Sequence, residues 1–203
     1  MERRRLSRLG ILGGTFDPPH IGHLLLGETA RQQLQLDKVL IMPVGKPPHK
    51  ETSQITPLAH RLAMIELACA NNPDLLVDCT DCERPSPHYT ASLMPLVQEA
   101  YPDAQLWLLL GSDSLQDLPT WHYPQEIVAA CRLAVLPRPG VTVDWEQLVA
   151  AVPSICDRVD WLDGPSFTLS SSDVRRWLAV GRNLRYMLPA AVSGYIMREG
   201  LYQ

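Results

Sequence analysis

The chain has 203 residues with a formal net charge of −4, and 46% of its residues are hydrophobic against 20% charged. This length suffices for one domain with a substantial core, and the negative charge gives no reason to expect a nucleic-acid groove. No apolar run is long enough for a membrane span or a signal-peptide core. We therefore expect a single domain over residues 1–203 with neither a membrane nor a nucleic-acid partner.

Short apolar runs alternate with stretches of helical periodicity along the chain. The apolar runs predict buried strands at residues 9–12, 39–42, 75–79, 105–110, 132–136 and 158–162. The periodic stretches predict helices over residues 22–36, 57–70, 90–101, 124–130, 145–151, 171–180 and 189–198. Three segments between them are expected to be loops: residues 44–56, 81–88 and 111–114.

This alternation predicts an α/β fold with a Rossmann-like, doubly wound parallel sheet and helices on both faces. A small helical part is expected at the C-terminus, at about residues 165–203. In such sheets a ligand binds beyond the carboxyl ends of the strands, where the strand order reverses. The segments after the strands at 9–12 and 105–110 are therefore expected to lie side by side.

The segment Gly13–His23 reads GGTFDPPHIGH and joins the first expected strand to the first expected helix. Gly13 and Gly14 let a ligand approach the backbone, and a helix start offers unpaired N–H groups and a positive dipole end. His20 and His23 can add donors there, and positive charge if protonated. Neither a Walker loop nor a G-x-G-x-x-G spacing is present. The segment predicts a phosphate-binding loop of another kind.

A second phosphate site is expected at the start of a later helix, in the segment Thr168–Arg175, which reads TLSSSDVR. Ser170 and Asp173 have the spacing of a capping box. Arg175 follows Ser172 by three positions, so an arginine and a hydroxyl group share one helix surface. Such a helix start, lined with hydroxyls and an arginine, is typical of phosphate binding.

The cysteines are five in number and show no disulfide-scaffold pattern, which favours a reducing, cytoplasmic location. Cys79 and Cys82 have C-x-x-C spacing, but no second pair accompanies them. They close a strand-like run, in which residues three apart point to opposite faces. We therefore expect no metal site built from protein side chains.

The segment Gly13–His23 resembles the G-G-x-F-D-P-x-H-x-G-H signature of the nucleotidyltransferase superfamily, and residues 169–175 resemble its I-S-x-T-x-x-R motif. Further matches narrow the resemblance to the bacterial nicotinate-nucleotide adenylyltransferases: residues 47–50, 87–90, 111–115, 119–121, 138–140 and 200–202. His88 stands where this family usually has Ser. His122 stands where an aromatic residue, often Tyr, usually follows the Trp.

The resemblance implies a role for each matching residue. His20, His23 and Arg175 would be catalytic and stabilise charge on the phosphates. Those that would bind ATP are Gly13, Gly14, Thr15, Phe16, Asp113, Ser170 and Ser172. Asp113 would accept hydrogen bonds from the adenosine ribose. Those that would bind the acceptor substrate are Lys46, His49, Lys50, Tyr89, Thr90, Trp121, His122 and Arg138.

The implied reaction transfers the adenylyl group of ATP to nicotinate mononucleotide, giving deamido-NAD and pyrophosphate in NAD biosynthesis. The acceptor phosphate is already an anion, so it attacks the α-phosphorus directly, and catalysis rests on positioning and charge stabilisation. Mg²⁺ is expected on the phosphate oxygens.

Two alternatives stay open at this point. One is another adenylyl- or cytidylyltransferase of the superfamily, with an acceptor such as phosphopantetheine. The other is a non-catalytic nucleotide sensor, against which the retention of both histidines and Arg175 argues. The sequence also leaves the oligomeric state open, a homo-oligomer included.

Overall fold

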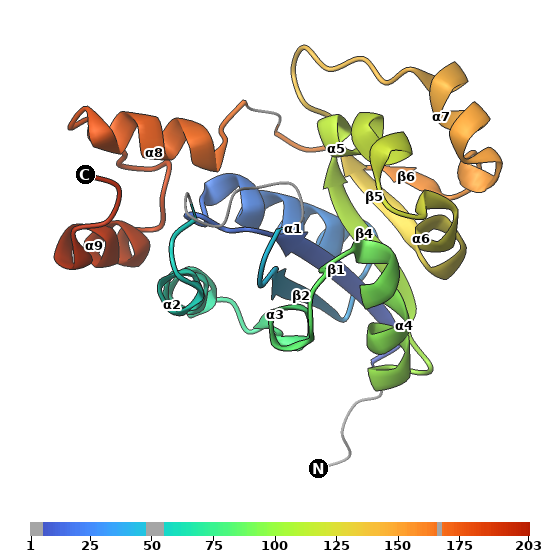
Figure 1. Ribbon diagram of the computed structural model, residues 1–203, viewed down its shortest axis with the longest axis horizontal. Helices are drawn as coiled ribbons and strands as arrows, with labels where there is room; N and C mark the ends of the chain where they lie inside the picture. The colour runs from blue at the N-terminus through green and yellow to red at the C-terminus, as the bar shows by residue number, and fades with distance from the viewer. Residues whose placement is uncertain (1–5, 48–54, 166–167) are drawn as a thin grey trace.

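The computed structural model describes residues 6–47, 55–165 and 168–203. Six parallel strands form one sheet in the order β3-β2-β1-β4-β5-β6 (Figure 1). The strands are β1 (Arg8–Gly14), β2 (Lys38–Pro43), β3 (Leu75–Val77), β4 (Gln105–Gly111), β5 (Arg132–Leu136) and β6 (Val159–Trp161). The order reverses between β1 and β4, which is the doubly wound Rossmann-like topology predicted from the alternation.

Helices cover both faces of the sheet because the strand residues alternate between two cores. Leu106, Leu108 and Leu110 of β4 belong to one buried cluster, and Trp107 and Leu109 belong to the other. The first core is closed by α4 (Thr90–Ala100), α6 (Pro124–Ala130) and α7 (Trp145–Ala151). The second is closed mainly by α1 (Ile21–Gln33) and α2 (Leu58–Cys69).

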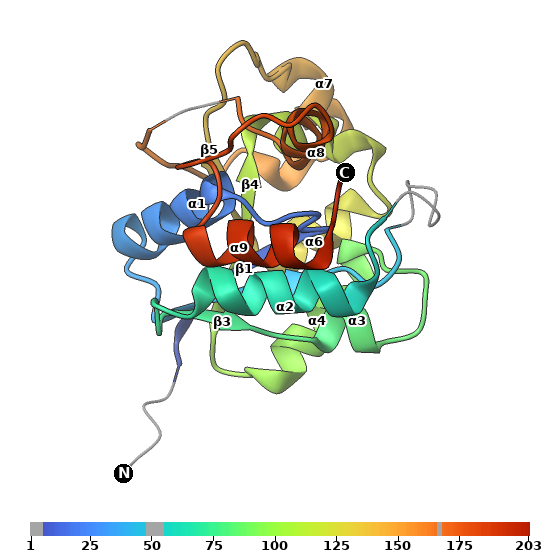
Figure 2. The same cartoon turned by 90° about the vertical axis from the view of Figure 1, so that its left-hand side faces the viewer.

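The C-terminal part consists of α8 (Ser171–Ala179) and α9 (Ala190–Glu199), which share a third apolar cluster with α2. Figure 2 shows α9 lying along α2, so the chain's end returns to the first half of the sheet. Met64 of α2 and Val192 of α9 are both fully buried in this cluster. Within the described residues, no helix combines the length and apolarity needed to cross a membrane.

Several predicted element bounds were wrong. The segment 111–114 is not a loop, because α5 (Ser112–Asp117) begins directly after β4, and a 3₁₀ turn at Leu118–Thr120 follows it. The segment 81–88 contains most of a short helix, α3 (Thr80–Glu83). The strand expected at 75–79 ends at Val77, and the helix expected at 22–36 ends at Gln33. Hydrophobic periodicity does not resolve the ends of elements, and it does not show elements of only a few residues.

The assignment of Cys79 and Cys82 to a strand was also wrong. Cys79 lies at the N-cap of α3, and the Cys82 Sγ–H donates to the Cys79 carbonyl oxygen over 3.3 Å. The two thiols therefore lie on the same turn instead of pointing to opposite faces. All five cysteines of the chain are free thiols.

Candidate functional site

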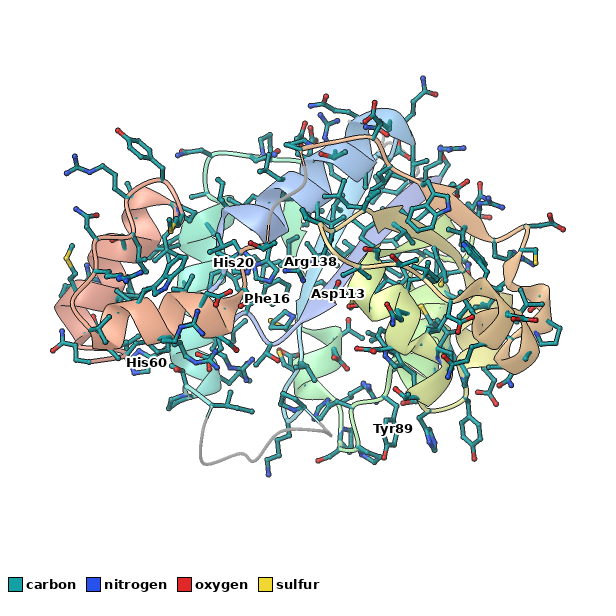
Figure 3. All side chains as sticks on the ribbon, turned by 90° about the horizontal axis from the view of Figure 1, so that it is seen from above. Phe16, His20, His60, Tyr89, Asp113 and Arg138 are labelled. Carbon is teal, nitrogen blue, oxygen red and sulfur yellow. The ribbon has the colours of Figure 1, made fainter. Side chains whose placement is uncertain are left out.

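A cavity of about 420 Å³ lies at the carboxyl ends of β1 and β4, where the strand order reverses. It is lined from both sides by residues that the sequence singled out: Gly13, Thr15, Phe16, His20, His23, Asp113, Trp121, Arg138, Ser170, Ser172 and Arg175. Figure 3 shows Phe16, His20, Asp113 and Arg138 gathered near the middle of the molecule. The prediction that the segments after β1 and β4 meet at one sheet edge is therefore confirmed.

His20 and His23 form the start of α1 through a reciprocal pair of hydrogen bonds. His20 is the N-cap residue, and its Nδ1 accepts from the Gly22 N–H over 3.1 Å. The Nδ1 of His23 accepts from the His20 N–H, also over 3.1 Å. A neutral imidazole that accepts at Nδ1 carries its proton on Nε2. Each ring therefore retains an Nε2–H donor for a ligand in the cavity.

Both imidazoles are neutral in the free protein at pH 7. Burial lowers the pKa of His20 to about 4, with Arg138 adding to the shift and Asp173 opposing it. Burial also lowers the pKa of His23 well below its usual value, and His20 and Arg138 lower it further. The two rings lie only 3.8 Å apart between centroids, so a proton on one disfavours a proton on the other. In the free protein they are therefore hydrogen-bond donors and not cations.

The loop before the histidines keeps the floor of the cavity open. A Cβ added at Gly13 would meet no atom within 4 Å, so glycine leaves this space to a ligand. Phe16 has a φ of +50°, a conformation that costs free energy in a non-glycine residue. Its buried ring packs edge-on against His23 at 4.9 Å between centroids. Phe16 therefore supports His23 from behind, in addition to lining the cavity.

Asp113 and Arg138 form an ion pair across the opposite wall. Arg138 Nη1 lies 2.5 Å from Asp113 Oδ2, and Nη2 donates to the Leu169 carbonyl oxygen over 3.2 Å. Asp113 Oδ1 is buried, and among the described residues it has no hydrogen-bond partner. Such an orphaned acceptor is costly unless a donor reaches it. A ligand hydroxyl group would satisfy it.

The start of α8 forms the third wall. The Ser170 Oγ accepts from the Asp173 N–H over 3.1 Å and donates to Asp173 Oδ2 over 2.6 Å, so the predicted cap is confirmed. Ser172 Oγ lies 3.3 Å from Arg175 Nη2. Arg175 Nη1 donates to the Asp17 carbonyl oxygen over 2.6 Å. The arginine is therefore held against the loop that carries the histidines.

The remaining predicted residues that the structure describes, Gly14, Lys46, Tyr89, Thr90 and His122, do not line this cavity. Gly14 packs against the Phe16 ring, which a Cβ at this position would meet. Lys46 lines a different cavity together with Arg61 and His88. Thr90 is the first residue of α4. His49 and Lys50 lie outside the described residues.

Tyr89 and His122 form a separate aromatic pair. Their rings stack with 4.1 Å between centroids and 24° between planes. In Figure 3 Tyr89 lies apart from the four central residues of the cavity. His122 directly follows Trp121, which does line the cavity, so the pair lies next to its rim.

Asp17 and Ser171 are among the residues at the site that sequence reasoning missed. Asp17 lines the cavity and is only 3% exposed, although it stands within the recognised signature. Ser171 also lines the cavity, and its Oγ donates to the Pro18 carbonyl oxygen over 2.9 Å. Contacts between residues more than 150 positions apart leave no periodic signal. The buried position of a charged residue in a loop could not be read from its neighbours.

The side chains around the cavity do not form a metal site of their own. Within the described residues, no group of three or more His, Cys, Asp and Glu side chains could hold one. The carboxylates that line the cavity, Asp17 and Asp113, already accept hydrogen bonds from Tyr202 and Arg138. A divalent cation here fits as part of a phosphate complex, held by phosphate oxygens and water.

Comparison with known proteins relates the chain to one enzyme group. Residues 11–177 match the cytidylyltransferase-like family. The chain is 48% identical to a probable nicotinate-nucleotide adenylyltransferase of Thermomicrobium roseum, covering 98% of this chain and 92% of that protein. It is 43% identical to one of Roseiflexus sp., covering 96% and 98%.

A solved structure shares the fold. It is the Plasmodium falciparum nicotinic acid mononucleotide adenylyltransferase complexed with NaAD, with a TM-score of 0.79 and 19% identity over 97% of both chains.

Proposed function

Because the chain belongs to the cytidylyltransferase-like family and, within it, to the nicotinate-nucleotide adenylyltransferases, we propose that it transfers the adenylyl group of ATP to nicotinate mononucleotide. The products are deamido-NAD and pyrophosphate. The observation that carries the proposal is the pair of histidines at the start of α1, whose Nδ1 atoms accept backbone N–H groups. Their Nε2–H groups therefore remain as donors in the cavity that Ser172 and Arg175 also line. Such donors from two helix starts suit a polyphosphate chain.

ATP lies with its ribose at Asp113 and its phosphates between the starts of α1 and α8. The Asp113 Oδ1 atom, buried without a partner among the described residues, accepts a ribose hydroxyl. Ser170, Ser172 and Arg175 bind the phosphates from the α8 side, and Gly13, Thr15 and Phe16 lie along the nucleotide. ATP enters as its complex with Mg²⁺, whose charge offsets that of the phosphates.

The acceptor phosphate attacks the α-phosphorus in line. One P–O bond forms to the acceptor oxygen, and the bond from the α-phosphorus to the bridging oxygen breaks with release of pyrophosphate. No general base is needed, because the attacking oxygen carries no proton to remove. The Nε2–H groups of His20 and His23 donate to the α-phosphate oxygens as the charge there rearranges. Arg175 holds the departing phosphates.

The acceptor's pyridine ring is assigned to the rim formed by Tyr89, Thr90, Trp121 and His122. The stack of Tyr89 on His122 supports this, because it places two flat ring systems next to Trp121. Lys46, His49, Lys50 and Arg138 are proposed to contact the acceptor phosphate. We also place the reaction in the cytoplasm, in keeping with the five free thiols.

The test compares pyrophosphate release from ATP with three acceptors: nicotinate mononucleotide, nicotinamide mononucleotide and phosphopantetheine. We expect release with the nicotinate compound, and loss of it when EDTA removes Mg²⁺. Preference for phosphopantetheine would assign the chain to another transferase. ATP binding without release with any acceptor would indicate a nucleotide sensor.

A variant pair tests the role of the histidines. His23→Asn retains an oxygen that can accept the His20 N–H but removes the Nε2–H donor, so kcat should fall about 100-fold. His60→Asn is the matched control, because His60 binds the Tyr195 hydroxyl over 2.8 Å outside the cavity. Equal activity of both variants would overturn the assignment.

A further inference from the structure

The buried carboxylate of Asp17 joins the end of the chain to the loop that carries the histidines. Asp17 is 3% exposed, and its Oδ1 accepts a 2.5 Å hydrogen bond from the hydroxyl group of Tyr202, the second-last residue. Its Oδ2 accepts from the Thr56 N–H over 3.3 Å. Burial, and then the bond to Asp17, raises the pKa of the Tyr202 phenol, so the phenol remains a donor.

The same aspartate also holds Arg175, but through its backbone. Arg175 Nη1 donates to the Asp17 carbonyl oxygen over 2.6 Å, whereas the Oδ2 carboxylate oxygen lies 3.9 Å from that nitrogen. The arginine thus donates its hydrogen bond to a neutral carbonyl group, and its ion pair with the Asp17 carboxylate is a long one without a hydrogen bond. A guanidinium hydrogen-bonded directly to a carboxylate would have less of its charge available for a phosphate.

We propose that Tyr202 is a positioning residue for adenylyl transfer, which holds the Asp17 carboxylate away from Arg175 so that the arginine stays directed at the ATP phosphates. The proposal rests on the function proposed above. Tyr202 itself is not among the residues that line the cavity. It acts through Asp17 and Arg175.

Several contacts that do not involve the Tyr202 hydroxyl group also hold the C-terminal part against this loop. Ser171 Oγ donates to the Pro18 carbonyl oxygen over 2.9 Å, and the Ile21 N–H donates to the Met187 carbonyl oxygen over 3.0 Å. The Tyr202 ring packs against the apolar cluster shared by α2, α8 and α9. Removing the hydroxyl group alone therefore leaves the C-terminal part seated, while the carboxylate loses its hydrogen bond from Tyr202.

The test is Tyr202→Phe with Tyr195→Phe as its matched control. Tyr195 also lies in the C-terminal part. Its replacement by Phe removes a hydrogen bond of 2.8 Å to His60 Nδ1, a bond that does not involve Asp17. We expect Tyr202→Phe to lower kcat/KM for ATP about tenfold and to weaken ATP binding by calorimetry, since a hydrogen bond to a charged group is lost. Tyr195→Phe should change neither by more than about twofold.

A double-mutant cycle shows whether the effect passes through Arg175. In an Arg175→Lys background, Tyr202→Phe should cost less than twofold, because the group that it positions is already replaced. Additive losses, or equal losses in Tyr202→Phe and Tyr195→Phe, would overturn the proposal. Failure of the proposed function is a separate result: the unmodified protein would then bind ATP without releasing pyrophosphate, and the calorimetric comparison would still test Tyr202.

Discussion

Lowering the pH from 7 to 5 should destabilise the protein by about 2 kcal/mol through His20 alone. In the folded protein, burial lowers the pKa of this imidazole to about 4 from an ordinary value of 6.5. The unfolded chain therefore binds a proton at a higher pH than the folded one. The stability present above pH 6.5 is lost as the pH falls from 6.5 toward 4.

The magnitude follows from the two pKa values. At pH 5 the unfolded imidazole is protonated in about 30-fold excess over its neutral form, whereas the folded imidazole is still mostly neutral. A factor of about 30 in the folding equilibrium corresponds to about 2 kcal/mol. At pH 7 the two pKa values change the free energy of unfolding by only a few tenths of a kcal/mol.

Urea unfolding of the unmodified protein and of His20→Asn at pH 7, 6 and 5 measures this effect. Asparagine is a good N-cap residue, so it can still accept from the Gly22 N–H, but it does not titrate. The stability difference between the two proteins should change by about 2 kcal/mol in favour of the variant between pH 7 and pH 5. His122→Asn, which removes an exposed imidazole, is the control.

A stability difference that stays the same at pH 7 and pH 5 would refute the reasoning. It would mean that the folded protein accepts a proton on His20 as easily as the unfolded chain does. The histidines could then be cations in the free protein, and the role of neutral Nε2–H donors at the α-phosphate would lose its basis.

Two further predictions concern the same walls of the cavity. The kcat should stay level between pH 8 and pH 6, because neither histidine needs a proton beyond the one on Nε2; a rise toward pH 6 would instead indicate a cationic imidazole. Ser170→Ala should lower the free energy of unfolding by about 1 kcal/mol, because the Asp173 N–H loses its capping acceptor. Urea unfolding measures this loss, and an unchanged midpoint would show that water replaces the cap.

The sheet and most of its helices could be predicted from local patterns. The continuous apolar run at residues 105–110 has the character of a strand buried on both faces, and β4 indeed contributes to both cores. The segments whose type was predicted wrongly were short ones. Residues 112–117 form a helix because the chain turns directly from β4 into α5, which buries Leu115, and six residues are too few to show a helical period.

The sequence by itself determined which chemical groups stand at the starts of α1 and α8, because loop glycines, capping residues and the spacing of histidines and serines are local properties. The tertiary structure decided what those groups do. Only the packing of the α8 start against the loop after β1 brought the two motifs into one cavity, and burial keeps His20 and His23 neutral below pH 6.5 as well. The bond from Tyr202 to Asp17 spans 185 positions. Such a contact depends on the path of the whole chain, which no local pattern records.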